Sequence, residues 1–127
     1  MKTILVIEDN TDIRENICEL LELDGYEVVA ADSGIAGLEL AKEKLPGIII
    51  CDIVMREIDG YEVIKELRRD KKTAKIPVIV ITALAQQKEI EMGLALGVKA
   101  YIKKPFLEEE LSQCISSCFQ QERSETA

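Results

Sequence analysis

Short apolar runs alternate along the chain with longer segments in which apolar residues recur at helical spacing. The run at 47–52 is short, β-branched and bounded by Pro46, which is typical of a buried strand of a parallel sheet. Four further runs predict strands at 2–7, 26–31, 78–82 and 98–102. A buried strand delivers its last residue to the carboxyl edge of its sheet, where open α/β sheets bind ligands. We therefore expect Asp52 at the mouth of a crevice.

Five helices are predicted between and after these strands. Asn10 or Thr11 can cap the first, and Gly25 ends it; the others span 33–44, 61–69, 86–96 and 107–119. The strict alternation implies right-handed crossovers and a parallel sheet with helices on both faces. We predict one doubly wound, flavodoxin-like α/β domain over 1–119, with five parallel strands in the order 2-1-3-4-5 and five helices. A frayed polar tail follows at 120–127.

The composition fits a single hydrophobic core and argues against some classes of function. The 127 residues are 47% hydrophobic. Their net charge of −8 argues against a nucleic-acid surface as the main feature, because phosphate backbones are bound by clustered lysine and arginine. No apolar run approaches the ~20 residues of a membrane span, and we expect no signal peptide. Four cysteines without a CxxC pair, in a chain without histidine, indicate reduced thiols in a cytoplasmic protein.

Four strand ends bring polar residues to the same edge of the predicted sheet. Glu8 and Asp9 follow the first strand, Asp52 ends the third, Thr82 ends the fourth, and Lys104 lies just beyond the fifth. The carboxylates repel one another at neutral pH, and a hard divalent ion such as Mg²⁺ relieves that repulsion. An ammonium and a hydroxyl opposite them fit the oxygens of a phosphoryl group. Asp52, which faces both, is placed to attack phosphorus.

Each of these residues alone also has an ordinary structural explanation. An aspartate after a strand is commonly a helix cap, and an acidic pair before a helix complements the helix dipole. The Lys-Lys-Pro sequence at 103–105 is commonly solvated surface. Four separate strand ends carry residue types that suit a metal and phosphoryl site. This combination favours a functional site over the structural explanations.

With these residues the chain resembles the receiver domain of bacterial two-component response regulators, the class of the chemotaxis regulator. The resemblance covers about 2–119. The features that carry it are Glu8–Asp9, Asp52, Asp59–Gly60, Thr82–Ala83, Tyr101 and Lys104–Pro105. The resemblance implies a phosphoprotein that acts as a switch and not as an enzyme. Asp52 would accept a phosphoryl group from a phosphohistidine on a sensor histidine kinase or a histidine phosphotransfer protein.

The resemblance also implies roles for the residues around Asp52. The ligands of Mg²⁺ would be Glu8, Asp9, Asp52 and the backbone carbonyl of Val54. The phosphoryl-binding residues would be Thr82, Ala83 and Lys104. Lys104 is chosen because the lysine of the family directly precedes the proline, which would follow a cis bond; Lys103 is the alternative.

Thr82 and Tyr101 would form the switch pair. On phosphorylation the Thr82 hydroxyl turns toward the new oxygens, and Tyr101 rotates into the space that it leaves. The readout surface would be the face made by 86–96, 98–102 and 107–119. It would bind a downstream protein or an output domain absent from this chain, or form a homodimer, with no contact to nucleic acid or membrane. Lys99 and Lys103 flank Tyr101 on this face, and they either serve the readout or protect an edge strand from pairing.

Two positions in the loop after Asp52 depart from the family pattern. Arg56 stands where the family usually has proline, and Ile58 where it often has methionine. Loss of the proline removes a backbone restraint near the metal. Val54 and Leu84, two residues beyond Asp52 and Thr82, are apolar and cannot orient a water molecule, so we expect slow loss of the phosphoryl group.

Three other functions fit the sequence less well than a receiver does. A phosphohydrolase with an aspartate nucleophile typically has a second aspartate two residues later, where this chain has Val54. A nucleotide-binding switch lacks the glycine-rich loop after the first strand. A binding module that is never phosphorylated is disfavoured by the complete set of acceptor-site residues. The sequence is compatible with a stand-alone regulator and with a receiver cut from a longer protein.

Overall fold

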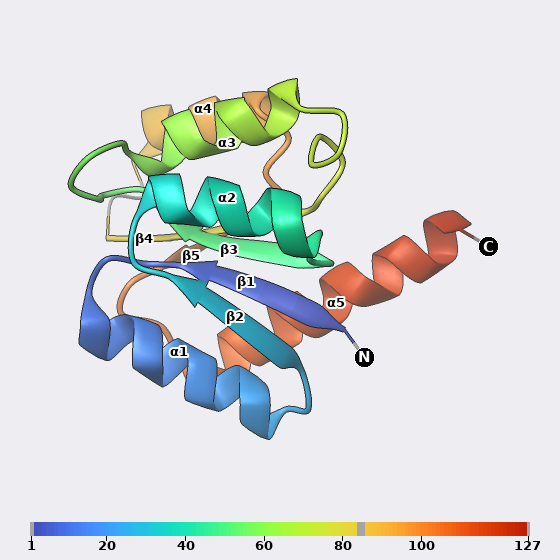
Figure 1. Cartoon of the computed structure of the whole chain (residues 1–127). Helices are drawn as coiled ribbons and strands as arrows, with labels where there is room; N and C mark the ends of the chain where they lie inside the picture. Colours follow the sequence, from blue (N-terminus) through green and yellow to red (C-terminus); the bar gives the residue numbers. More distant parts are fainter. Residues whose placement is uncertain (1, 84–85, 127) are drawn as a thin grey trace.

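Figure 1 shows a sheet that lies between two layers of helices. The computed structural model describes residues 2–83 and 86–126. Within them the strands are β1 Thr3–Ile7, β2 Glu27–Ala31, β3 Ile48–Asp52, β4 Val78–Thr82 and β5 Ala100–Lys103. The helices are α1 Thr11–Leu23, α2 Gly34–Lys44, α3 Gly60–Arg69, α4 Gln87–Ala95 and α5 Glu108–Thr126.

The strand order is β2-β1-β3-β4-β5, and every neighbouring pair is parallel, as predicted. Apolar side chains form one cluster on each face of the sheet. Ile17 of α1 and Ile115 of α5 pack in the first cluster, and Ala41 of α2 and Val63 of α3 pack in the second. In Figure 1, α4 lies on the same side of the sheet as α2 and α3. The doubly wound, flavodoxin-like fold is confirmed.

β3 and β4 lie in the middle of the sheet, and every residue of both strands is buried. Helices cover both of their faces, which explains why their sequences are continuous apolar runs and not alternating patterns. Asp52 is therefore held at the end of a rigid, central element. α3 begins directly against this strand end: a Cβ at Gly60 would lie 2.8 Å from Ile53 Cα, so only glycine permits the approach.

Two element boundaries differ from the prediction by two residues or more. β5 begins at Ala100 because the N–H of Val98 donates to Gly93 O at 3.0 Å and thereby closes the end of α4. α5 continues to Thr126, although we predicted a frayed tail after Phe119. Glutamine, glutamate and arginine in the tail have high helix propensities, and a helix that is already nucleated extends through such residues at little cost.

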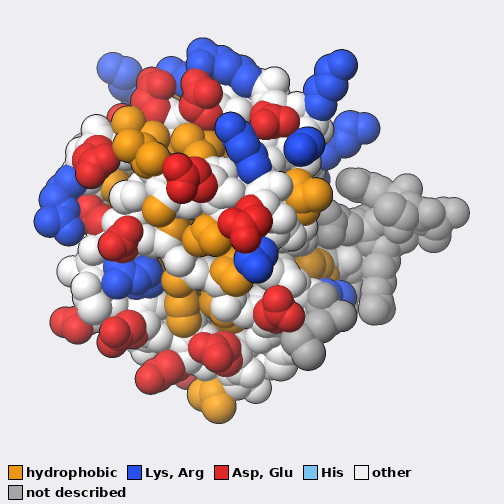
Figure 2. Space-filling view, in the orientation of Figure 1, with side chains coloured by type: hydrophobic (Ala, Val, Ile, Leu, Met, Phe, Trp, Pro, Cys, Tyr) orange, Lys and Arg blue, Asp and Glu red, His pale blue; other side chains and the backbone are white. Residues whose placement is uncertain are grey.

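The surface carries charges of both signs. Figure 2 shows many of the lysine and arginine side chains along the upper edge and upper right of one face, whereas acidic groups are spread over the whole face, including its lower part near α1. Across the described residues, no helix has both the length and the apolar character to cross a membrane. None of the four cysteines takes part in a disulfide bond.

Candidate functional site

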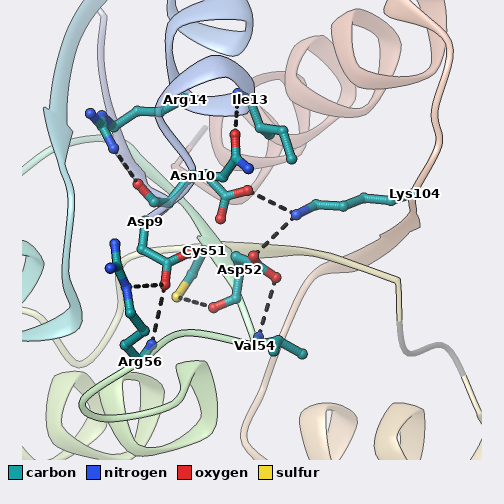
Figure 3. A network of polar contacts seen from close by, with 10 residues as sticks. Asp9, Asn10, Ile13, Arg14, Cys51, Asp52, Val54, Arg56 and Lys104 are labelled. Carbon is teal, nitrogen blue, oxygen red and sulfur yellow. Dashed lines mark hydrogen bonds and ion pairs between the residues drawn. The ribbon is translucent and has the colours of Figure 1, made fainter.

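Acidic residues from two strand ends meet at the carboxyl edge of the sheet (Figure 3). Glu8 and Asp9 follow β1, and Asp52 ends β3. β1 and β3 are neighbours with Ile7 paired to Cys51, which brings the three carboxylates together. One carboxylate oxygen of each residue lies within 4.8 Å of the other two. The predicted acidic cluster is therefore present.

Lys104 places a positive charge between two of these carboxylates. Its ammonium nitrogen lies 2.8 Å from Glu8 Oε1 and 3.1 Å from Asp52 Oδ2. The peptide bond from Lys104 to Pro105 is cis. Lys103, the alternative, is exposed at the end of β5. Burial alone lowers the pKa of Lys104, but its hydrogen bonds to the two carboxylates outweigh that effect and raise the pKa.

Glu8 has the most perturbed carboxylate of the site. Its side chain is fully buried, and burial together with the neighbouring Asp52 raises its pKa to about 8, against the opposing effect of Lys104. Its second oxygen, Oε2, is buried without a hydrogen-bond partner. Such an oxygen costs free energy unless a proton or a cation meets it. Because the cluster offers hard oxygen donors, these residues fit Mg²⁺.

Asp9 is held by the loop that follows β3. The backbone N–H of Arg56 donates to Asp9 Oδ2 at 3.2 Å, and the guanidinium nitrogen Nε lies 3.6 Å from the same oxygen. A proline at this position could not make the first contact, because it has no N–H. From the sequence, the missing proline indicates only a lost restraint, and the contact with Asp9 becomes visible in the structure. The absence of proline was the signal that a backbone donor is available there.

Asp52 is 5% exposed, and both of its carboxylate oxygens accept hydrogen bonds. Oδ2 accepts from Lys104, and Oδ1 accepts from the backbone N–H of Val54 at 3.3 Å. Val54 is 55% exposed beside the site. Leu84, expected near it, lies outside the described residues.

Thr82 and Ala83 lie where the sequence predicts them. Thr82 ends β4 and is buried, and Ala83 follows it and is exposed. The backbone N–H of Lys104 donates to Thr82 O at 2.9 Å, which ties the end of β4 to the segment after β5. Thr82, Asp52 and Lys104 thus stand at the ends of adjacent strands.

Tyr101 alternates with Lys99 and Lys103 along the last strand, but its exposure differs from theirs. The two lysines are exposed, but Tyr101 is only partly exposed and packs on the cluster beneath α2 and α3. Its hydroxyl donates to the backbone oxygen of Glu89 in α4 at 2.8 Å. The exposed part of β5 is therefore basic, and the aromatic ring is turned under α4.

A doubly wound sheet of this order, with an acidic cluster and a lysine before a cis proline at its carboxyl edge, is a CheY-like signalling domain. The model of the response regulator receiver domain family matches residues 4–116. The chain therefore belongs to the receiver domains of two-component response regulators, as its motifs predict.

Similar proteins differ in how much of their length the chain covers. Protein PilH of Pseudomonas aeruginosa is 32% identical over 117 residues, which are 92% of this chain and 97% of PilH. The polar-differentiation response regulator DivK of Brucella ovis is 38% identical, with 82% of this chain and 85% of DivK covered. The DNA-binding dual master transcriptional regulator RpaA of Synechocystis is 40% identical over 87% of this chain. The chain spans 46% of RpaA, about half the length of that relative.

Solved structures agree with the fold. The chemotaxis protein CheY4 of Vibrio cholerae superposes with a TM-score of 0.89 at 27% identity and covers 93% of this chain and 98% of its own. A receiver domain protein from Clostridium thermocellum gives a TM-score of 0.89 at 29% identity, over 97% of this chain and 98% of its own.

Proposed function

We propose that this receiver accepts a phosphoryl group on Asp52 from a phosphohistidine of a sensor histidine kinase or a histidine phosphotransfer protein. The observation that carries the proposal is the position of Lys104, whose ammonium contacts both Glu8 and Asp52. This arrangement provides a nucleophile, a set of oxygens for a cation, and an ammonium for phosphoryl oxygens within one site. Membership of the receiver family supports the same function.

In the transfer, an oxygen of Asp52 attacks phosphorus. The new O–P bond forms as the P–N bond of the phosphohistidine breaks, and the imidazole leaves with the electron pair of that bond. The position of Asp52 at the end of a buried strand fixes the nucleophile. Lys104 and the N–H of Val54 orient its carboxylate.

Glu8, Asp9, Asp52 and the backbone carbonyl of Val54 would hold Mg²⁺, which supplies positive charge for the phosphoryl oxygens when bound. Glu8 must be ionised for this role. Because its pKa is raised to about 8, ion binding at neutral pH would release a proton from the site.

Lys104, Thr82 and Ala83 would receive the transferred group. The Lys104 ammonium can exchange a carboxylate for a phosphoryl oxygen, and Thr82 can donate its hydroxyl to another. Ala83 is small and exposed, and so leaves room for the group. Val54 offers no polar atom on its side chain to hold an attacking water, which favours a long-lived phosphorylated state.

The readout would be the surface formed by α4, β5 and α5. Its partner would be a downstream protein, an output domain outside this chain or a second copy of the domain. We propose no direct contact with nucleic acid, since the chain carries a net charge of −8. The domain would act in the cytoplasm as a phosphorylation switch and not as an enzyme that turns over a separate substrate.

A mass spectrum recorded after incubation with a small phosphodonor and Mg²⁺ tests the proposal. The chain should gain one phosphoryl group, and Asp52→Asn, which keeps the side-chain shape but not the nucleophile, should gain none. Removal of Mg²⁺ should strongly slow the uptake. Continuous hydrolysis of a phosphoester would favour the phosphohydrolase instead, and an unchanged mass would favour a binding module.

A further inference from the structure

Two tyrosines from different elements meet at one carbonyl oxygen of α4. Tyr101 of β5 donates to Glu89 O at 2.8 Å, and the hydroxyl oxygen of Tyr61 in α3 lies 2.8 Å from the same oxygen, where its single proton can turn to the Tyr101 hydroxyl instead. Their hydroxyl oxygens are 3.3 Å apart. Burial, followed by the hydrogen bond with Tyr101, raises the pKa of Tyr61, so Tyr61 remains a hydrogen-bond donor at neutral pH. The two rings thus share one polar anchor.

Gly93 makes room for this arrangement. A Cβ at position 93 would lie 2.6 Å from Tyr101 Cε2 and closer still to the Tyr101 hydroxyl oxygen. Side chains do not approach one another so closely, so any other residue at position 93 would displace the ring or the helix. Glycine is otherwise unfavourable inside a helix. Its presence in α4 therefore has a steric explanation: Tyr101 occupies the space that a side chain at position 93 would fill.

We propose that Gly93 and Tyr61 are positioning residues that hold Tyr101 inward and set the resting balance of the switch. Gly93 provides the space, and Tyr61 together with Glu89 O provides the polar anchor. These contacts come from α3 and α4, and none of them requires a phosphoryl group. In a two-state element the resting populations follow from the contacts that each state makes. The inward state is therefore substantially populated before phosphorylation. This inference rests on the proposed function only because it treats Tyr101 as the switch residue.

An inward resting position of Tyr101 reduces the contribution that phosphorylation must make to partner binding. If the resting chain already holds Tyr101 inward, part of the readout surface is formed in advance. A partner that prefers the inward state would then bind the resting protein measurably, and phosphorylation would add a smaller factor to its affinity. Weakening the anchor should lower resting binding and increase the response to phosphorylation.

NMR of the full chain with carbon-13-labelled tyrosine rings tests the assignment without any phosphodonor. The chain has three tyrosines, so each ring can be assigned by substitution. Gly93→Ala should move the Tyr101 signals to positions typical of a solvent-exposed ring. Alanine favours a helix more than glycine does, so α4 should still form. Tyr61→Phe removes the hydroxyl that contacts the Tyr101 hydroxyl at 3.3 Å, and should lower the ratio of inward to outward Tyr101 by up to about fivefold, the effect of that one hydrogen bond.

Tyr26→Phe is the matched control. Tyr26 stacks on Phe119 with ring centroids 5.5 Å apart, and its loss should leave the Tyr101 signals unchanged. Tyr101 signals that stay at their original positions in Gly93→Ala would overturn the inference about Gly93. The same result in Tyr61→Phe would overturn the role of Tyr61.

Phosphoryl uptake by the same samples separates this inference from the proposed function. Neither Gly93 nor Tyr61 contributes to the acceptor site, so both variants should still gain the group on Asp52. If Tyr101 moves as expected in samples that never take up a phosphoryl group, the positioning inference holds and the proposed function fails. If uptake is normal but Tyr101 does not move, the inference fails and the proposed function stands.

Discussion

Replacement of Arg68 by leucine should destabilise the fold by about 3 kcal/mol. Arg68 lies in the last turn of α3, and its guanidinium donates to four backbone carbonyls. Two of them, Leu96 and Gly97, follow α4, and the other two, Ala74 and Ile76, precede β4. One side chain therefore ties α3 to two loops that are far apart in the sequence.

The expected loss of stability follows from the length and the burial of each hydrogen bond of Arg68. The bonds to Leu96, Ala74 and Ile76 are 2.9–3.0 Å long and partly buried, whereas the bond to Gly97 is 3.3 Å long and exposed. A typical hydrogen bond contributes about 1 kcal/mol, and we count the exposed one as zero because water replaces it. Leucine and arginine have similar helix propensities, so the helix itself is not weakened. For 127 residues, the loss corresponds to a melting temperature roughly 10 °C lower.

Urea unfolding followed by circular dichroism measures this change, with Arg69→Leu as the matched control. Arg69 is the next residue of the same helix turn, is 69% exposed and pairs with Glu66 on its own helix. Its loss should cost no more than about 0.5 kcal/mol. Both substitutions remove one cation from the end of α3, so their effects on the helix dipole cancel. Equal unfolding midpoints for the two variants would refute the stabilising role of the carbonyl contacts.

Three further predictions concern the acceptor site. Asp9→Ala should weaken Mg²⁺ binding by roughly tenfold or more in calorimetry, since it removes a carboxylate ligand; an unchanged titration would dispose of the metal site. The raised pKa of Glu8 stabilises the metal-free fold fully below about pH 4.5, and this contribution is lost as the pH rises through about 8. Urea melts in a chelator should show that loss, and Glu8→Gln should abolish it. Val54→Asn should shorten the lifetime of the phosphorylated protein after donor removal, because the amide can hold a water; decay as slow as in the parent would contradict this.

The sequence predicts the fold well because burial alone determines most of it. β3 and β4 are covered on both faces, so their composition is distinctive, and the alternation with helices then dictates parallel pairing. The meeting of Glu8, Asp9, Asp52 and Lys104 follows from the same rule, since each stands at or just beyond the carboxyl end of a strand. Topology places these residues before any side-chain detail is known.

Contacts that depend on side-chain direction were not predictable in this way. The inward turn of Tyr101 requires a glycine on the facing helix and a tyrosine from α3, and no local pattern connects these positions. The hydrogen bond from Arg56 to Asp9 depends on the path of the loop after β3, which lacks a proline at this position. The true end of α5 depends on propagation from a docked helix, which overrides the polar character of the tail.

α5 begins shortly after Pro105 and runs to Thr126, so it joins the acceptor edge to the opposite side of the molecule, where Figure 1 places both ends of the chain. Leu111 and Ile115 anchor its first half in the core. At 19 residues it is a rod about 28 Å long. One degree of tilt at the start of this helix displaces its far end by about 0.5 Å. A module attached at that end would be displaced by any tilt of α5, without touching α4 or β5.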